Sequence, residues 1–541
     1  MTGEGPNMKN YEETVRTFQW DIPERFNFAW DVVDRWATDE HRLALHWLSR
    51  EGEERKFTFA DFRRLSNRFA NVAQHLGLKR GDVVLVMLPR RPEWQVVMLG
   101  LMKLGIVPAP CTTMLRPKDI EYRANLAEAR AIITDTANAD KVEAVKDTCP
   151  TLEHLILVGG ERSGWVSYEQ AMREAASELV GVEKTRSSDP ALLYFTSGTV
   201  GGPKMVLHNH GYALAHRLTG EYWLDLKPSD LHWNLSDTGW AKAAYSTLFG
   251  PWNMGATVFM FEGGFDPEQT LHLLQQYGIT VFCAPPTAYR MLVREDLRKY
   301  AFRLRHVVSA GEPLNPEVIA VWRETTGLSI YDGYGQTETI ILVANFPCME
   351  TKPGSMGKPM PGHEVAIIDV DGNELPAGQE GEIAVRGHPP SLFQGYWKNP
   401  ELTARTRRGE WYVTGDRAYR DEEGYFWFVG RADDVIISAG YRIGPFEVES
   451  ALVEHPAVVE AAVVASPDEV RGQIVKAFVV LSPDAQPSDE LVKELQEHVK
   501  NVTAPYKYPR EIEFVKELPK TISGKIRRVE LRRRELERKK K

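Results

Sequence analysis

The sequence predicts an α/β protein with a large N-terminal domain of layered α/β subdomains plus a β unit, followed by a small α+β C-terminal domain. Three observations indicate this fold class. Short apolar runs alternate with amphipathic stretches through the first two-thirds of the chain, closely spaced apolar–polar alternation begins near residue 363, and a compact mixed pattern follows residues 429–434. A chain of 541 residues is also longer than one hydrophobic core usually serves.

The first part of the chain predicts largely parallel sheets. DVVLVML (82–88) is typical of a buried strand, and EWQVVMLGLMKLG (93–105) is typical of a helix that follows it. Further short strands with helical connections are expected at 129–135, 154–159, 280–285 and 304–312. This rhythm is typical of α/β layers.

The later parts predict two smaller units. HEVAIIDVDGNELP places an Asp-Gly turn between alternating apolar residues, which is a hairpin signal, and the strand-like GEIAVRG follows closely. Beyond this β unit, PFEVESALVEHP and SDELVKELQEHVKNV predict helices, whereas VVEAAVVASP and VKAFVVLSP predict strands. We therefore expect a large domain over 1–430, a connection at 431–434 and a small domain over 435–541. The basic tail LRRRELERKKK is interpreted as a solvated helix end.

Composition narrows the class of protein. The net charge of -9 argues against a general nucleic-acid binder, and 43% hydrophobic with 26% charged residues is ordinary for a soluble protein. The four cysteines form no CxxC pair, which fits a reducing compartment without structural zinc. The N-terminus resembles neither a secretory signal nor a transit peptide, and no run of about 20 apolar residues could span a bilayer. We expect a cytoplasmic protein with no membrane segment; its oligomeric state is not indicated.

The strongest local motif is YFTSGTVGGPKMV (194–206), a strand followed by a loop rich in hydroxyls and glycines. The glycines allow backbone N–H groups to turn towards an anion, and one lysine adds positive charge, so the loop can hold a polyphosphate. Its spacing is not that of a Walker A loop, and by itself it could be only a tight turn. The residues in question are Thr196, Ser197, Gly198, Thr199, Gly201, Gly202 and Lys204.

Five further motifs follow in order: SAGEPL (309–314), YDGYGQTE (331–338), WYVTGDR (411–417), GRADDVIISAGYRIGPFEVE (430–449) and LPKTISGK (518–525). Together with the loop they resemble the adenylate-forming superfamily of acyl-CoA synthetases, adenylation domains and luciferases. The wider sequence is most similar to medium-chain acyl-CoA synthetases, for example at PSDLHWNLSDTGWAK and TAPYKYPR, from about residue 26 to the C-terminus. The resemblance implies ATP-dependent activation of a carboxylic acid as an acyl-adenylate, transfer of the acyl group to coenzyme A, and a mobile small domain.

The resemblance implies an ATP site on the large domain. Thr196 and Lys204 would lie closest to the β- and γ-phosphates, and Thr337 would contact the α-phosphate. Asp416 would accept hydrogen bonds from the ribose hydroxyls, with Arg431 supporting it; a carboxylate is the natural partner of a vicinal diol. The residues expected to flank the adenine are Gly311, Glu312, Pro313, Asp332, Gly333 and Tyr334.

Three residues are implied in catalysis: Lys525, Thr196 and Glu338. Lys525, in TISGK, would meet both the substrate carboxylate and the α-phosphate of ATP. The chemistry needs such a cation because two anions meet and the transition state adds charge on the equatorial oxygens. By analogy with an oxyanion donor, its loss would cost about 3–4 kcal/mol. Glu338 would help hold Mg²⁺, a hard cation suited to carboxylate oxygen.

The resemblance also implies a hinge at Asp433. After adenylation the small domain would rotate, withdraw Lys525 and bring the AGYRIG loop to the site, where Gly440 leaves room for the pantetheine arm. For Arg471 and Lys500 the alternative is a solvated surface charge. The full set expected to bind coenzyme A is Ala439, Gly440, Tyr441, Arg442, Arg471, Lys500, Tyr508 and Arg510.

The acyl pocket is expected at Trp240 and Gly335. Short-chain acetyl-CoA synthetases typically have tryptophan just before the QTE triplet, where this chain has Gly335, so the pocket should be deep. Each additional buried methylene contributes about 0.8 kcal/mol, which favours medium-chain or aryl acids over acetate.

One departure and three alternatives remain. Val200 stands where the family usually has Thr or Ser, so ATP binding or turnover is expected to be weakened. A benzoate-like aryl-CoA ligase uses the same chemistry. An adenylating module serving a carrier protein, or a non-catalytic binder with the same fold, would be a different class of protein; intact Lys525, Glu338 and Asp416 argue against the non-catalytic binder.

Overall fold

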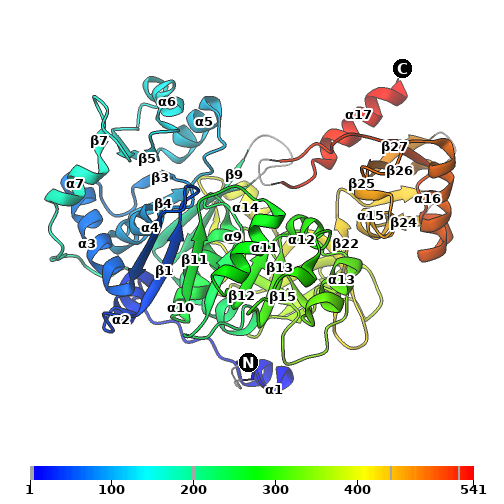
Figure 1. Cartoon of the computed structure of the whole chain (residues 1–541), viewed down its shortest axis with the longest axis horizontal. Coiled ribbons are helices and arrows are strands. Elements are labelled where there is room, and N and C mark those ends of the chain that lie inside the picture. Colours follow the sequence, from blue (N-terminus) through cyan, green and yellow to red (C-terminus); the bar gives the residue numbers. More distant parts are fainter. Residues whose placement is uncertain (1–4, 197–202, 439–440, 469–470, 522–523, 541) are drawn as a thin grey trace.

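A computed structural model describes residues 5–196, 203–438, 441–468, 471–521 and 524–540. A large body carries most of the chain, and a smaller lobe at the C-terminal end lies beside it (Figure 1). The α/β class with a large N-terminal and a small C-terminal domain is thereby confirmed.

The largest sheet has nine strands, and its centre is parallel. Antiparallel strands close both edges, because β2 pairs with β1 and the β14–β15–β16 run reverses direction. The sheet matters for the site because β13 and β14 carry two of the sequence motifs at their carboxyl ends. The strand order is β16 (Lys358–Pro359), β15 (Ile341–Ala344), β14 (Ile330–Gly335), β13 (His306–Ala310), β12 (Val281–Ala284), β10 (Leu231–Asn234), β11 (Thr257–Phe261), β1 (Leu43–Leu48) and β2 (Glu54–Thr58).

A second, parallel sheet is built from the apolar runs near the N-terminus. All residues of β3 are buried, as its continuous apolar sequence predicts for a parallel strand covered on both faces. The helix α4 (Pro92–Leu104) is buried along its whole length and ends at Gly105, whose φ of 70° provides the left-handed cap. The order is β4 (Val107–Pro110), β3 (Val83–Met87), β5 (Ala131–Asp135), β6 (His154–Val158) and β7 (Val166–Ser167).

A small antiparallel sheet carries the glycine-rich motif of residues 194–206. It consists of β8 (Pro190–Thr196), β9 (Lys204–Asn209) and β19 (Gly395–Tyr396). The remaining helices of the body are α1 (Tyr11–Thr17), α2 (Asp34–Trp36), α3 (Phe59–His75), α5 (Pro117–Ala127), α6 (Ala139–Glu143), α7 (Tyr168–Glu174), α8 (His210–Leu218), α9 (Ala241–Ala243), α10 (Gly250–Asn253), α11 (Pro267–Gln276), α12 (Pro286–Leu292), α13 (Pro316–Thr326) and α14 (Pro400–Ala404).

The predicted β unit is an antiparallel sheet, but its hairpin differs in detail. The Asp371-Gly372 turn is present, yet across it only an isolated bridge joins Ile368 to Glu374. The full partner of β17 is the following strand, β18. The sheet comprises β17 (Val365–Ile368), β18 (Gly381–Arg386), β21 (Trp411–Arg420) and β20 (Arg407–Arg408), with β22 (Phe426–Arg431) on β21.

The smaller lobe has its own core and the predicted order of elements. The helices α15 (Pro445–Val453) and α17 (Arg528–Lys540) pack against its three-stranded sheet, and α16 (Asp489–Val502) lies against α15. Its strands are β25 (Val458–Asp468), β26 (Gly472–Leu481) and β27 (Glu511–Phe514), with the pair β23 (Ile436–Ser438) and β24 (Tyr441–Ile443) beside them. Across the described ranges, no helix combines the length and apolar character required to cross a membrane.

The connection between the two parts is short. The strand β22 ends at Arg431 and β23 begins at Ile436. In that interval Arg532 of α17 donates a 2.9 Å hydrogen bond to the Asp433 carbonyl and forms an ion pair with Asp434. The predicted boundaries at 430 and 435 remain a prediction.

Candidate active site

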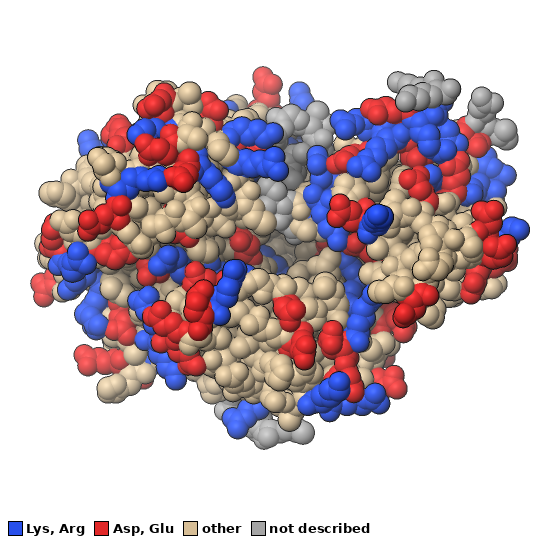
Figure 2. Space-filling model, turned by 45° about the horizontal axis from the view of Figure 1, so that its top comes forward, with Lys and Arg blue, Asp and Glu red and all other residues tan. Residues whose placement is uncertain are grey.

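A cavity of about 1200 Å³ lies where the body and the smaller lobe meet. Lysine and arginine side chains gather on both sides of the hollow between the two parts (Figure 2). All of the described residues expected to bind ATP line this cavity: Thr196, Lys204, Gly311, Glu312, Pro313, Asp332, Gly333, Tyr334, Thr337, Asp416, Arg431 and Lys525. Glu338, Trp240, Gly335 and Asp433 line it as well.

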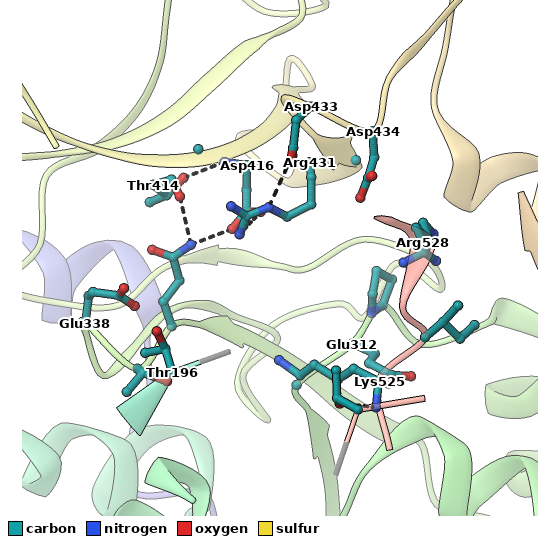
Figure 3. A pocket seen from close by; sticks show the side chains of 18 of the residues that line it. Thr196, Glu312, Glu338, Thr414, Asp416, Arg431, Asp433, Asp434, Lys525 and Arg528 are labelled. Atoms are coloured by element: carbon teal, nitrogen blue, oxygen red, sulfur yellow. Dashed lines mark hydrogen bonds and ion pairs between the residues drawn. The ribbon is translucent and has the colours of Figure 1, made fainter. Parts of the chain in front are cut away.

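Asp416 is held by a hydrogen-bond network at one wall of the cavity (Figure 3). Its Oδ2 accepts a 2.6 Å hydrogen bond from the Tyr334 hydroxyl and a 2.7 Å hydrogen bond from Gln336 Nε2. Gln336 is fixed in turn, since its Nε2 donates to the Thr414 carbonyl and its Oε1 accepts from Tyr412. The carboxylate is therefore oriented before any ligand arrives.

Arg431 is placed beside Asp416 by strand pairing. The two residues are register partners on β21 and β22, and Arg431 Nη1 lies 3.4 Å from Asp416 Oδ1. Burial raises the pKa of Asp416, and the charge of Arg431 with the hydrogen bonds from Tyr334 and Gln336 opposes that rise. Arg431 Nε also lies 3.8 Å from Asp433 Oδ1, so the same guanidinium joins the Asp416 network to the expected hinge.

The end of the cavity expected to hold the polyphosphate is lined by Thr196 and Lys204. They are paired across β8 and β9, at the two ends of the glycine-rich loop. Lys204 Nζ lies 5.2 Å from the centre of the Tyr396 ring. The other expected loop residues, Ser197, Gly198 and Thr199, lie outside the described residues, as does Val200.

Thr337 and Glu338 occupy the connection between β14 and β15. The Thr337 carbonyl makes a 2.7 Å hydrogen bond with Nε2 of His208, whose pKa burial lowers to about 3, so that this histidine is neutral and donates. Glu338 Oε1 accepts a 2.8 Å hydrogen bond from the Tyr396 hydroxyl.

Glu338 fits the role of a magnesium ligand. No cluster of three or more His, Cys, Asp or Glu side chains arranged for a metal occurs in the described part of the chain, so a cage made of protein ligands is not observed there. The Glu338 carboxylate, which lines the cavity, matches the way Mg²⁺ is held by one or two carboxylates together with substrate phosphates.

The expected adenine-flanking residues come from β13, β14 and the turn after β13. Gly311 has a φ of 110°, a conformation that favours glycine. Gly333 has no room for a side chain, since a Cβ there would lie 2.7 Å from the Trp223 ring. Burial raises the pKa of Asp332 to about 8, so near neutral pH its carboxyl is mainly protonated and can donate as well as accept a hydrogen bond.

Lys525 reaches this cavity from the smaller lobe. It follows a tight turn in which its backbone N–H donates to Thr521 Oγ1 at 3.1 Å, and it lies with Glu312 across the cavity from Asp416 (Figure 3). Nearby, Arg528 forms an ion pair with Glu449 at 2.7 Å within the smaller lobe. The structure therefore brings Lys525 together with the expected ATP residues.

Trp240 and Gly335 line the same cavity, and Gly335 has an additional reason to be glycine. A Cβ at this position would lie 2.3 Å from the Ile340 carbonyl oxygen, because the β14–β15 pairing is irregular there. The close backbone approach was not visible in the sequence.

The described residues expected to bind coenzyme A do not line the cavity. Ala439 and Gly440 lie outside the described residues, and of Arg442 only the backbone, paired with Ile437, is described. The exposed Tyr441 stacks on Tyr506, and Lys500 pairs with Glu497. The others absent from the cavity wall are Arg471, Tyr508 and Arg510.

Sequence reasoning missed three residues that shape the site: Gln336, Tyr396 and Lys242. Gln336 could have been found, since it lies inside the QTE triplet, whereas Tyr396 is far from Glu338 in sequence. Lys242 Nζ donates to the Ala310 carbonyl at 2.9 Å. Burial lowers the pKa of Lys242, and the nearby charge of Lys525 adds to this.

Comparison with known proteins identifies the family. Residues 33–397 match the AMP-binding enzyme family, and residues 447–525 match the AMP-binding enzyme C-terminal domain. The chain belongs to the AMP-binding enzyme family.

Relatives of this AMP-binding enzyme are similar over nearly their whole length. It is 51% identical to acyl-coenzyme A synthetase ACSM3, mitochondrial, of Pongo abelii, over 98% of this chain and 93% of the relative. It is 50% identical to the mitochondrial acyl-coenzyme A synthetase ACSM4 of Homo sapiens, over 97% and 93% of the two chains.

Two solved structures share the fold of this AMP-binding enzyme. The anthranilate CoA ligase AuaEII in complex with anthranoyl-AMP has a TM-score of 0.89 at 33% identity, covering 96% of this chain and 99% of that chain. A benzoate CoA ligase from Burkholderia xenovorans LB400 has a TM-score of 0.83 at 30% identity, covering 94% and 100%.

Proposed function

We propose that this AMP-binding enzyme is an ATP-dependent medium-chain acyl-CoA synthetase that forms AMP. The observation that carries the proposal is the position of Lys525 in one cavity with Thr337, Glu338 and Asp416, although these residues come from different parts of the chain. Relatives of about 50% identity are acyl-coenzyme A synthetases, which supports the acid–thiol ligase activity.

The first half-reaction follows from the charges around the cavity. A carboxylate oxygen of the acid attacks the α-phosphorus of ATP, the bond to the bridging oxygen breaks, and pyrophosphate leaves. Lys525 would neutralise the two anions as they meet, and Asp416 would hold the ribose hydroxyls through its fixed Oδ atoms. A magnesium ion bound with Glu338 would supply charge neutralisation for the phosphates.

The second half-reaction transfers the acyl group to coenzyme A. The thiolate attacks the acyl carbonyl, and AMP leaves with the electron pair of the broken C–O bond. Because the expected coenzyme A residues lie away from the cavity, this step requires a rearrangement of the smaller lobe, with Asp433 as the hinge. We also infer domain boundaries at 430 and 435, because only a short connection separates β22 from β23.

The acyl pocket supports a medium-chain acid. Gly335 and Trp240 both line the cavity, and Gly335 adds no side chain to its wall. A second candidate, an aryl acid–CoA ligase, is favoured by the likeness to the anthranilate and benzoate CoA ligases.

One assay distinguishes the two candidates. Formation of CoA thioester is measured with straight-chain acids from C2 to C12, benzoate and anthranilate, each with ATP, Mg²⁺ and coenzyme A. A maximum of kcat/KM among the C6–C10 acids supports the proposal, whereas a maximum with benzoate or anthranilate supports the aryl ligase. Absence of thioester with every acid would contradict both.

The compartment is a separate question. The cytoplasmic location expected from the sequence is not confirmed, because the relatives are named as mitochondrial. Fractionation of cells that express the full chain with a C-terminal tag would locate the protein directly.

A further inference from the structure

Arg123, on α5, is a buried cation at the wall of the cavity. Its exposed fraction is only 9%, and it lines the cavity together with Thr196 and Lys204. Within the described ranges its guanidinium has no carboxylate within ion-pair distance, and the hydrogen bond that it makes there runs from Nη1 to the Asp119 carbonyl at 3.1 Å. An arginine carries five N–H groups, so within the described ranges most of these donors make no hydrogen bond.

Two contacts place Arg123 beside the polyphosphate motif. Its guanidinium carbon lies 5.0 Å from the centre of the Phe195 ring, and Phe195 immediately precedes Thr196. The neighbouring Tyr122 hydroxyl donates a 3.3 Å hydrogen bond to the Pro203 carbonyl, next to Lys204. The helix α5 thus contacts the chain on both sides of the glycine-rich loop, next to Thr196 and next to Lys204.

The physical chemistry of this arrangement points to an anionic ligand. Burying a positive charge without a counter-ion is unfavourable, and stacking on Phe195 offsets only part of that cost while holding the guanidinium plane in place. An anion bound in the cavity would offset the rest of the free-energy cost of burying this charge. The planar fork of arginine suits phosphate oxygens in particular, because two parallel N–H groups can bind two oxygens.

We propose that Arg123 binds the terminal phosphates of ATP and the pyrophosphate product. This inference rests on the proposed function and adds a phosphate-binding residue that none of the sequence motifs contained. The carboxylate of the acid is a less suitable ligand, since it must meet the α-phosphate at Lys525 and Thr337, whereas Arg123 adjoins Thr196. Arg123 is a binding residue for the leaving group of adenylation, and it has no part in thioester formation, where pyrophosphate is absent.

The test uses ATP–pyrophosphate exchange, which measures adenylation and its reversal in the presence of a carboxylic acid. Arg123→Met removes the charge while keeping apolar bulk against Phe195. Arg130→Met is the matched control: Arg130 precedes β5 in the same part of the body, pairs with Asp82 and Glu153, and does not line the cavity. Thioester formation from purified acyl-AMP and coenzyme A is measured in parallel.

Arg123→Met should raise the KM for pyrophosphate and for ATP about 10- to 100-fold, the size expected for loss of a charge-assisted hydrogen bond. Its thioester half-reaction should stay within twofold of the parent, and Arg130→Met should change neither. Unchanged KM values for pyrophosphate and ATP, or an equal loss in both half-reactions, would overturn the inference.

Arg123→Lys keeps the charge but loses the planar fork, and it covers the case in which the methionine variant does not fold. Its KM for pyrophosphate should rise several-fold less than that of Arg123→Met, with kcat for thioester formation retained; no rise would contradict the assignment. If the parent enzyme itself shows no acid-dependent exchange, the proposed function fails, which is a different outcome from exchange that is insensitive to Arg123.

Discussion

The Tyr334 hydroxyl donates a 2.6 Å hydrogen bond to Asp416 Oδ2, joining the end of β14 in the large parallel sheet to β21 in the antiparallel β unit. Gln336 makes a second bond to the same oxygen, so two residues of one motif orient a carboxylate about 80 positions away. Because Asp416 is 5% exposed, the network fixes it in a largely dry environment. A ribose bound there would find its acceptor already oriented.

Loss of this network should weaken nucleotide binding. Asp416→Asn removes the charge that faces Arg431 and should raise the KM for ATP about 10- to 100-fold, whereas Tyr334→Phe removes one neutral donor and should raise it about fivefold. Steady-state kinetics with saturating acid and coenzyme A measure both effects. Tyr419→Phe, on the same strand but away from the cavity, is the control. An unchanged KM in Asp416→Asn would remove the ribose assignment.

The raised pKa of Asp332 predicts a pH-dependent stability. Burial raises this pKa from 3.8 to about 8, so the folded state holds a proton that the unfolded state releases. The resulting stabilisation is complete below pH 3.8 and is lost as the pH rises through about 8. In that window the parent should lose stability relative to Asp332→Asn by at most about 1.4 kcal/mol per pH unit. Urea unfolding of both proteins at pH 6 and pH 8.5 measures the difference; parallel curves at the two pH values would show that Asp332 is not buried in this way.

Gly335 should resist any side chain for a backbone reason. Since a Cβ would lie 2.3 Å from the Ile340 carbonyl oxygen, Gly335→Ala should lower the free energy of unfolding by about 1–3 kcal/mol while keeping most of the chain-length profile. Gly335→Trp should show the same destabilisation and, in addition, shift preference towards acetate. Thermal melts combined with thioester assays separate the two effects. An alanine variant as stable as the parent would mean that the β14–β15 backbone relaxes freely.

Arg532 should stabilise the connection between the two parts. It donates to the Asp433 carbonyl at 2.9 Å and pairs with Asp434, so Arg532→Ala frees the expected hinge residue and the residue that follows it. We expect faster limited proteolysis within 431–435 and slower overall turnover. Arg533→Ala removes a neighbouring charge whose pair with Glu537 is 3.8 Å long and exposed, and it should change neither rate. Equal proteolysis of both variants would contradict this role.

Much of the fold could be predicted because its signals are local. The strands β3, β5 and β6 are continuous apolar runs, and the order of elements in the smaller lobe follows from periodicity alone. The Asp371-Gly372 turn indicated a hairpin, but only an isolated bridge joins Ile368 to Glu374 across it, because turn chemistry does not reveal that β17 pairs along its length with β18.

The candidate site likewise has a part that could be predicted from short motifs and a part that could not. The residues expected to bind ATP lie within short motifs, and those that the structure describes line one cavity. The features that could not be predicted depend on contacts that sequence motifs do not reveal. These are the hydrogen bond from Tyr396 to Glu338, the contact of the Arg123 guanidinium with the Phe195 ring, and the Ile340 carbonyl close to Gly335. The residues expected to bind coenzyme A could be named, but those that the structure describes do not line the cavity, and we propose that they act in another arrangement of the smaller lobe.

The most direct test of two-step catalysis is Lys525→Ala, measured in each half-reaction. Because Lys525 lines the cavity with Asp416 and Thr337, the variant should lose acid-dependent ATP–pyrophosphate exchange by about 100-fold or more, corresponding to about 3–4 kcal/mol of transition-state stabilisation. Thioester formation from supplied acyl-AMP and coenzyme A should remain within a few-fold of the parent. Equal loss in the two half-reactions, or full exchange activity without the lysine, would contradict the account.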